Sequence, residues 1–126
     1  VLNIHMIKEV ISKMHKHGFK ENEIYSAYKI FFGTLVSEPR LKIINLLRKG
    51  GRSVSEIISE LKMNQTSVSH NLTRLKKCGF VGVKTRGKFR YYTLNKKTIK
   101  PLMSLINNHM NEYCIHILKK NKGGKR

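Results

Sequence analysis

Residues 64–78, N-Q-T-S-V-S-H-N-L-T-R-L-K-K-C, combine hydrogen-bonding and basic side chains and contain no acid. Amides, hydroxyls and an imidazole can reach base edges in the DNA major groove, whereas Arg and Lys pair with phosphate. At 100° per residue, Thr66, His70, Thr73 and Lys77 lie opposite an apolar stripe, and Gln65, Ser69, Arg74 and Lys76 lie on its flanks. This pattern predicts a DNA-reading helix; the alternative is the solvated face of an ordinary surface helix.

Three side chains near the C-terminal end have the chemistry of metal ligands. His109, Glu112 and His116 lie within about 60° of one another on a helical wheel, and zinc accepts nitrogen and oxygen ligands. Two helical turns do not close a tetrahedron, so further ligands would have to come from His5, His15 or His17. We expect no resident cofactor. Two interpretations of these three residues remain open: a site for a metal inducer, or solvated side chains at the rim of a dimer interface.

The two cysteines, Cys78 and Cys114, could instead carry a redox switch. Two thiols distant in sequence bridge only if their Cα atoms come within about 7 Å. The alternative is two packed, reduced thiols. Residues 1–10 lack the features of a secretory signal, so we expect a cytoplasmic protein with reduced cysteines.

Charge is the strongest property of the whole chain, which has 26 Lys and Arg against seven acids and a formal net charge of +19. No acidic residue occurs from Leu61 to Asn111. Such a charge repels itself unless a polyanion is near, which favours nucleic acid as partner. No apolar run is long enough to span a membrane. The sequence contains no Asp, no Gly-rich phosphate loop and no nucleophile elbow, so we expect that the protein is not an enzyme.

The elements around residues 64–78 are those that would present a reading helix. Ser53 or Ser55 can cap a short helix that ends near Leu61, and a break at Met63-Asn64 then gives a helix-turn-helix. After Gly79 the apolar period changes to two, which predicts a hairpin, or wing, at residues 80–94. It lacks the paired aromatic rings that single-stranded RNA would use. Its cations would contact backbone or minor groove: Lys84, Arg86, Lys88 and Arg90.

Two further helices are expected before the helix-turn-helix. Residues 22–35 have a broad apolar face and predict a core helix. Ser37, Glu38 and Pro39 form a helix start signal, and the helix that follows should end at Gly50-Gly51.

Heptad-like apolar seams occur at both ends of the chain, in residues 2–17 and 98–119. A palindromic DNA site is matched by a protein with two-fold symmetry, so we predict a homodimer joined by both terminal helices. The alternative is packing of the first helix on the last within one chain. The predicted interface residues are Ile4, Ile7, Ile11, Ile99, Met103, Ile106, Met110, Tyr113 and Ile117.

The runs S-E-P-R-L-K-I-I-N-L-L, V-S-E-I-I-S-E-L, N-Q-T-S-V-S-H-N-L-T-R-L-K-K-C-G-F-V and R-Y-Y-T-L resemble the ArsR/SmtB-type winged-helix repressors over residues 29–98. The resemblance implies a homodimeric regulator that releases its operator when an inducer binds. It also implies that Ser67 joins Gln65, Thr66, Ser69 and His70 in reading DNA. The cysteine pair of the arsenic sensors is absent from residues 54–57. Lys96 and Thr98 stand where zinc-type sensors carry metal ligands.

These observations predict a mainly α-helical, winged helix-turn-helix fold with a small antiparallel β-hairpin. We expect one domain over residues 1–126, with dimerisation helices at 1–17 and 98–119, the winged helix-turn-helix at 22–98 and a disordered basic tail at 120–126. The predicted function is sequence-specific binding of double-stranded DNA by a transcriptional regulator, most simply a repressor. The alternative is a DNA-coating protein of architectural type with little sequence preference.

Overall fold

The computed structural model describes residues 8–9, 12–14 and 16–123. The chain divides into two compact units, Val1–Leu41 and Lys42–Arg126. The predicted interface residues Ile4, Ile7 and Ile11 lie outside the described residues. No helix in the described part of the chain is long and apolar enough to cross a membrane.

The first unit contains helical residues at 8–9 and 12–14 and then α2, Glu21–Leu35. The N–H of Lys20 donates to Glu23 Oε1 at 3.1 Å and fixes the start of α2. At the other end, Arg40 Nε donates to the carbonyl of Thr34 at 2.8 Å, which satisfies an acceptor that the helix terminus leaves open.

The prediction that α2 is a core helix was wrong for the single chain. Of its residues only Ile24 and Thr34 are buried. Four of its large apolar side chains are instead exposed by 44% to 56%: Tyr25, Tyr28, Ile30 and Phe32. Apolar periodicity identifies a face that needs covering, but it does not say whether the same chain covers it.

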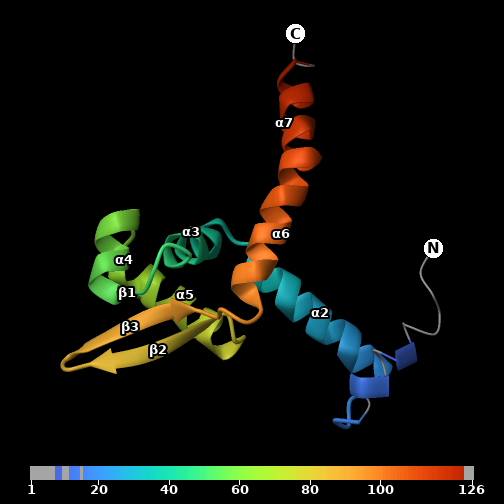
Figure 1. Cartoon of the computed structure of the whole chain (residues 1–126), viewed down its shortest axis with the longest axis horizontal. Helices are drawn as coiled ribbons and strands as arrows, with labels where there is room; N and C mark the ends of the chain where they lie inside the picture. Colours follow the sequence, from blue (N-terminus) through green and yellow to red (C-terminus); the bar gives the residue numbers. More distant parts are fainter. Residues whose placement is uncertain (1–7, 10–11, 15, 124–126) are drawn as a thin grey trace. The chain divides into compact units, whose positions relative to one another are not determined.

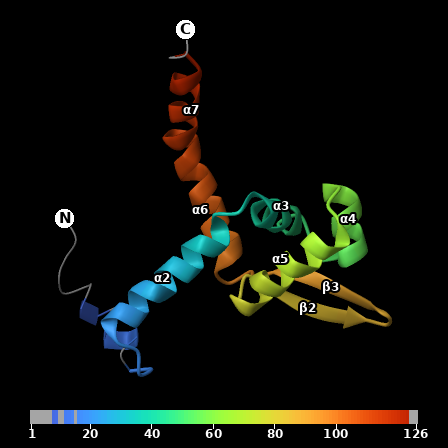
Figure 2. The same cartoon turned by 180° about the vertical axis from the view of Figure 1, so that it is seen from behind.

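The second unit contains the winged helix-turn-helix, so this prediction was confirmed (Figures 1 and 2). Helix α3, Glu38–Leu47, leads into the second unit and ends three residues before Gly50, where the sequence predicted its end. Helices α4, Val54–Leu61, and α5, Gln65–Lys77, follow and contact each other. The apolar core of this unit includes Ile43, Ile44, Leu46, Leu47, Ile57, Val68, Leu72, Leu75, Phe80, Val81 and Leu94.

The wing is a sheet of three antiparallel strands in the order β1-β3-β2, not the expected pair. Strands β2, Val81–Arg86, and β3, Phe89–Leu94, form the predicted hairpin, which extends to a tip directed away from α6 in both views (Figures 1 and 2). Gly87 has φ 59° in its two-residue turn, at the position where a type II′ turn takes glycine. Strand β1, Arg52–Ser53, pairs with β3 and was missed because two residues carry no periodic pattern.

A set of backbone bonds joins the end of α5 to the base of the wing. The N–H of buried Phe80 donates to the carbonyl of Leu75, and the N–H of Asn95 donates to the carbonyl of Phe80, both at 2.9 Å. The side chain of Asn95 also donates to the carbonyl of Gly79 at 3.0 Å. Reading helix and wing are therefore held to each other at a fixed point.

The predicted C-terminal helix is divided into α6, Ile99–Glu112, and α7, Cys114–Gly123, so the expectation of one helix over 98–119 was wrong. The break is at Tyr113, with φ −126° and ψ −68°. No Pro or Gly lies there; the preceding turns contain three asparagines, which are weak helix formers. Because α7 reaches Gly123, residues 120–123 are helical instead of belonging to a disordered tail.

Candidate nucleic-acid interface

The rotation of α5 about its axis is set by a cap and a buried stripe. Asn64 Oδ1 accepts the N–H of Ser67 at 2.7 Å, which satisfies one of the open donors at the helix start. Val68, Leu72 and Leu75 are at most 1% exposed. Since this stripe faces the core, the opposite side of α5 faces solvent.

Four polar residues of the predicted reading face, Gln65, Thr66, Ser69 and His70, are exposed. Their side chains make no hydrogen bond or ion pair with the rest of the described chain. Thr73 is exposed as well, but its Oγ1 donates to the carbonyl of Ser69 at 2.9 Å, so only its acceptor lone pairs remain available. The first two turns of α5 thus offer donors and acceptors that the described residues do not use.

Ser67 and Arg74 differ from the other predicted DNA-contacting residues because both are half-buried. Nδ2 of Asn71, itself 8% exposed, donates to the carbonyl of Ser67 at 2.9 Å and to Ser67 Oγ at 3.3 Å. Ser67 therefore contributes to holding the start of α5 in place. Further along, Lys76 and Lys77 are exposed in the last turn.

The four predicted wing cations are all exposed, and the strand register divides them between two faces. Lys84 lies opposite Tyr91 and Arg86 lies opposite Phe89, so these four residues share the outer face. Arg90, opposite Thr85, shares the other face, whose base is buried. Lys88 lies in the turn. The wing therefore presents positive charge to both sides of its tip.

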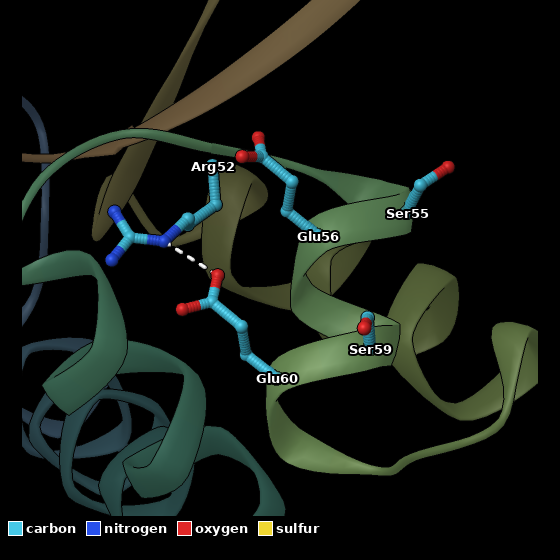
Figure 3. A pocket seen from close by; sticks show the side chains of 5 residues that line it. All are labelled: Arg52, Ser55, Glu56, Ser59 and Glu60. Carbon is cyan, nitrogen blue, oxygen red and sulfur yellow. Dashed lines mark hydrogen bonds and ion pairs between the residues drawn. The ribbon is translucent and has the colours of Figure 1, made fainter.

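Helix α4 has a different surface, a hollow lined by Arg52, Ser55, Glu56, Ser59 and Glu60 (Figure 3). Arg52 Nε contacts Glu60 Oε2 at 2.7 Å, and its Nη1 donates to the carbonyl of Gly50 at 2.9 Å. These bonds join α4 to the loop and strand before it. The acids of α4 make the hollow unsuited to phosphate.

A capping box starts α4 and shows that Ser53, not Ser55, is the cap. Ser53 Oγ accepts the N–H of Glu56 at 3.2 Å, and Glu56 Oε1 accepts the N–H of Ser53 at 2.9 Å. This bond to the Ser53 backbone, then the Ser53 hydroxyl, and Arg52 nearby, lower the pKa of the Glu56 carboxyl below 4.5.

The predicted metal-ligand set is not brought together. In the described part of the chain, no three His, Cys, Asp or Glu side chains are close enough to hold a metal ion. His109 and Glu112 end α6, whereas His116 lies in α7, so the break at Tyr113 separates them. His109 instead packs on the Tyr113 ring, with centroids 4.8 Å apart.

Neither cysteine forms a disulfide bond within the described chain, and the two lie in different settings. Cys78 is half-buried at the end of α5, and Cys114 is exposed at the start of α7.

The structure divides the predicted dimer seam into buried and exposed parts. Ile99 and Met103 are 4% and 2% exposed in the single chain, so they belong to its interior and not to an open seam. Ile106 is half-buried. Three seam residues are exposed by 40% to 61%: Met110, Tyr113 and Ile117.

Known proteins are similar to this chain in both sequence and fold. A family model described as "Bacterial regulatory protein, arsR family" matches residues 37–83. The chain is 33% identical over 85 residues to the HTH-type transcriptional regulator MJ1325 of Methanocaldococcus jannaschii, covering 67% of this chain and 96% of that protein. It is 30% identical over 78 residues to the transcriptional repressor SdpR of Bacillus subtilis, covering 61% and 87%.

Among solved structures, the homodimeric winged helix-turn-helix DNA-binding domain Mb0332 from Mycobacterium bovis superposes with a TM-score of 0.69. It is 28% identical, and the match covers 79% of this chain and 94% of that one.

Proposed function

The chain belongs to the ArsR family of winged helix-turn-helix regulators, and we propose that it is a homodimeric repressor that binds a palindromic operator in double-stranded DNA. In this proposal it acts in the cytoplasm by occupying a promoter, and catalysis has no part in its function. The observation that carries the proposal is the exposed side of α5, where four polar side chains of the first two turns form no hydrogen bond or ion pair within the described chain.

The α5 side chains have the chemistry needed to read bases. The Gln65 amide can bond adenine at two points, and serine, threonine and imidazole groups can donate to or accept from other base edges. They lie in the first two turns, the part of a recognition helix that enters the major groove. Half-buried Ser67 is the least available of the predicted reading residues.

Phosphate contacts would supply much of the affinity. Exposed cations lie at the end of α5 and around the wing tip, with no acid among them between Leu61 and Asn111. Neutralising phosphates releases condensed counterions, so binding should weaken as salt rises.

A homodimer explains the apolar surfaces that one chain leaves exposed. On α2 the rings of Tyr28 and Phe32 stack with centroids 6.4 Å apart, and both are more than 40% exposed. The exposed seam residues Met110, Tyr113 and Ile117 add a second apolar surface. Large exposed apolar patches mark interaction sites. The relative SdpR is a transcriptional repressor, which supports repression, and the Mb0332 domain is homodimeric, which supports two-fold assembly.

In vitro selection from a random duplex library tests the DNA-binding proposal. We expect an enriched palindrome whose half-sites are centred about 10 base pairs apart, because two recognition helices would enter successive major grooves. The enriched duplex should bind at least about 10³-fold more tightly than a scrambled one at about 150 mM salt. Equal binding that collapses steeply with salt would instead support a DNA-coating protein.

Charge introduced into the apolar surfaces tests the dimer. Ile106→Glu with Tyr113→Glu, and separately Tyr28→Glu with Phe32→Glu, should give monomers in sedimentation, because a dimer would bury these charges without partners. Leu105→Glu is the control, since Leu105 is 67% exposed and lies off the predicted seam. Dimers from both double variants would contradict the proposed surfaces.

We propose that an inducer acts on this assembly. We propose zinc and oxidants as the first compounds to test, because His109, Glu112 and His116 could ligate across two chains and Cys114 is an exposed thiol. Release of the selected duplex is the readout.

A further inference from the structure

The outer face of the wing contains an aromatic pair that the sequence analysis missed. Phe89 and Tyr91 are two residues apart on β3 and lie on the same face, with ring centroids 6.4 Å apart. The prediction that the hairpin lacks paired aromatics was therefore wrong. The alternation F-R-Y in the sequence was the signal.

Phe89 is the exposed member of the pair. Its side chain is 60% exposed, although a phenylalanine at a two-residue turn gains nothing for folding by facing water. Tyr91, further from the tip, is half-buried, and the guanidinium of Arg86 lies 5.9 Å from its ring centroid. Tyr91 thus contacts both Phe89 and Arg86, while Phe89 remains the most exposed ring of the wing, beside its turn.

Cations lie on both faces of the wing close to Phe89. Arg86 lies directly opposite Phe89 across the hairpin, Lys88 precedes it and Arg90 follows it. Its sequence neighbourhood contains no acid. An exposed ring with positive charge close by is suited to a partner that offers both phosphate and stacked bases.

We infer that Phe89 is a wedge that enters the DNA minor groove beside the operator half-site and partly unstacks one base step. This inference rests on the proposed function, since it is α5 in the major groove that would bring the wing to the adjacent minor groove. Arg86, Lys88 and Arg90 then contact the phosphates on either side. Apolar wedges of this kind kink duplex DNA and favour flexible pyrimidine–purine steps.

The test uses the selected duplex with 2-aminopurine placed at successive flanking positions, whose fluorescence rises when the base unstacks. The whole chain should raise the fluorescence at one step in each flank. Phe89→Ala should abolish this rise and weaken binding about tenfold, while preference over scrambled duplex remains. Phe89→Leu keeps an apolar wedge and should retain most of both effects.

Leu105→Ala is the matched control, because Leu105 is at least as exposed, at 67%, but lies outside the wing and off the predicted dimer seam. It should leave fluorescence and affinity unchanged, and thermal melting should show that all three variants fold. Preference for the selected duplex without a fluorescence change would overturn the wedge and leave the proposed function intact. If the unaltered protein bound the selected and the scrambled duplex equally well, the proposed function would be overturned. Phe89-dependent binding that is tighter on single strands than on duplex would replace the wedge with single-strand stacking.

Discussion

Helices α4 and α5 both begin at a hydrogen-bonded cap, Ser53 and Asn64, but their exposed side chains differ. On α4, Glu56 and Glu60 are bonded to neighbours in their own chain. On α5, the exposed amide of Gln65, the hydroxyls of Thr66 and Ser69 and the imidazole of His70 have no such partners in the described residues. The difference indicates that α4 stabilises the fold and that α5 is available to bind another molecule. Polar side chains that a protein leaves unpaired on a rigid helix are the better guide to an interface than polarity itself.

The largest effect should come from removing the unpaired groups of α5. Gln65→Ala with His70→Ala should reduce preference for the selected duplex on the order of 100-fold, because each good base contact contributes about 1–3 kcal/mol. Binding to scrambled duplex should change little. Titrations of both duplexes provide the measurement.

Ser55→Ala with Ser59→Ala is the matched control for that variant. Both serines are exposed on α4, and these changes should alter either affinity by no more than about twofold. If the control lowered preference as much as the α5 variant, the contrast between the two helices would not hold.

The two caps allow a closer comparison. Ser53→Ala and Asn64→Ala should each lower the free energy of unfolding by about 1 kcal/mol, since each leaves an open N–H at a helix start. Only Asn64→Ala should also weaken operator binding in excess of its effect on folding, because it loosens the first turn of α5. Urea unfolding and duplex titration separate the two effects; equal binding by both variants would contradict this assignment.

Lys62, between the two helices, has φ 54° and ψ 44°, a left-handed conformation that costs about 1 kcal/mol for a residue with a Cβ. Lys62→Gly should therefore raise the free energy of unfolding by up to about 1 kcal/mol. Lys76→Gly removes the same charge from inside α5 and should lower it by about 1 kcal/mol. Changes of the same sign in urea unfolding would show that charge, not backbone conformation, dominates.

The smallest effect should be the pH dependence that Glu56 gives to α4. Its folded-state pKa is lowered from 4.5, so the unfolded chain binds the proton more readily. The stabilisation is therefore complete above about pH 4.5 and is lost as the pH falls through the folded-state pKa. Melting temperatures of the natural protein and Glu56→Gln should differ more at neutral pH than at about pH 3. A constant difference would exclude this role.

Local patterns predicted α5, its cap and the hairpin, because the apolar stripe and the period of two are read directly from neighbouring residues. The covering of α2 could not be predicted in this way, since its exposed rings depend on what lies beyond one chain. The break at Tyr113 has no Pro or Gly to mark it. That Gln65 and His70 have no hydrogen-bond partner among the described residues could not be predicted either, because a sequence does not show which polar side chains bond to each other.

Strand β2 lies at the edge of the sheet, and its six residues leave one row of backbone groups open to another strand. Such edges seed aggregation unless charge or poor strand formers protect them. Lys84, Arg86 and Gly82 provide both forms of protection in β2. The cations of the wing should therefore also keep a concentrated solution free of edge-to-edge association, and neutral replacements there would lower solubility even in the absence of DNA.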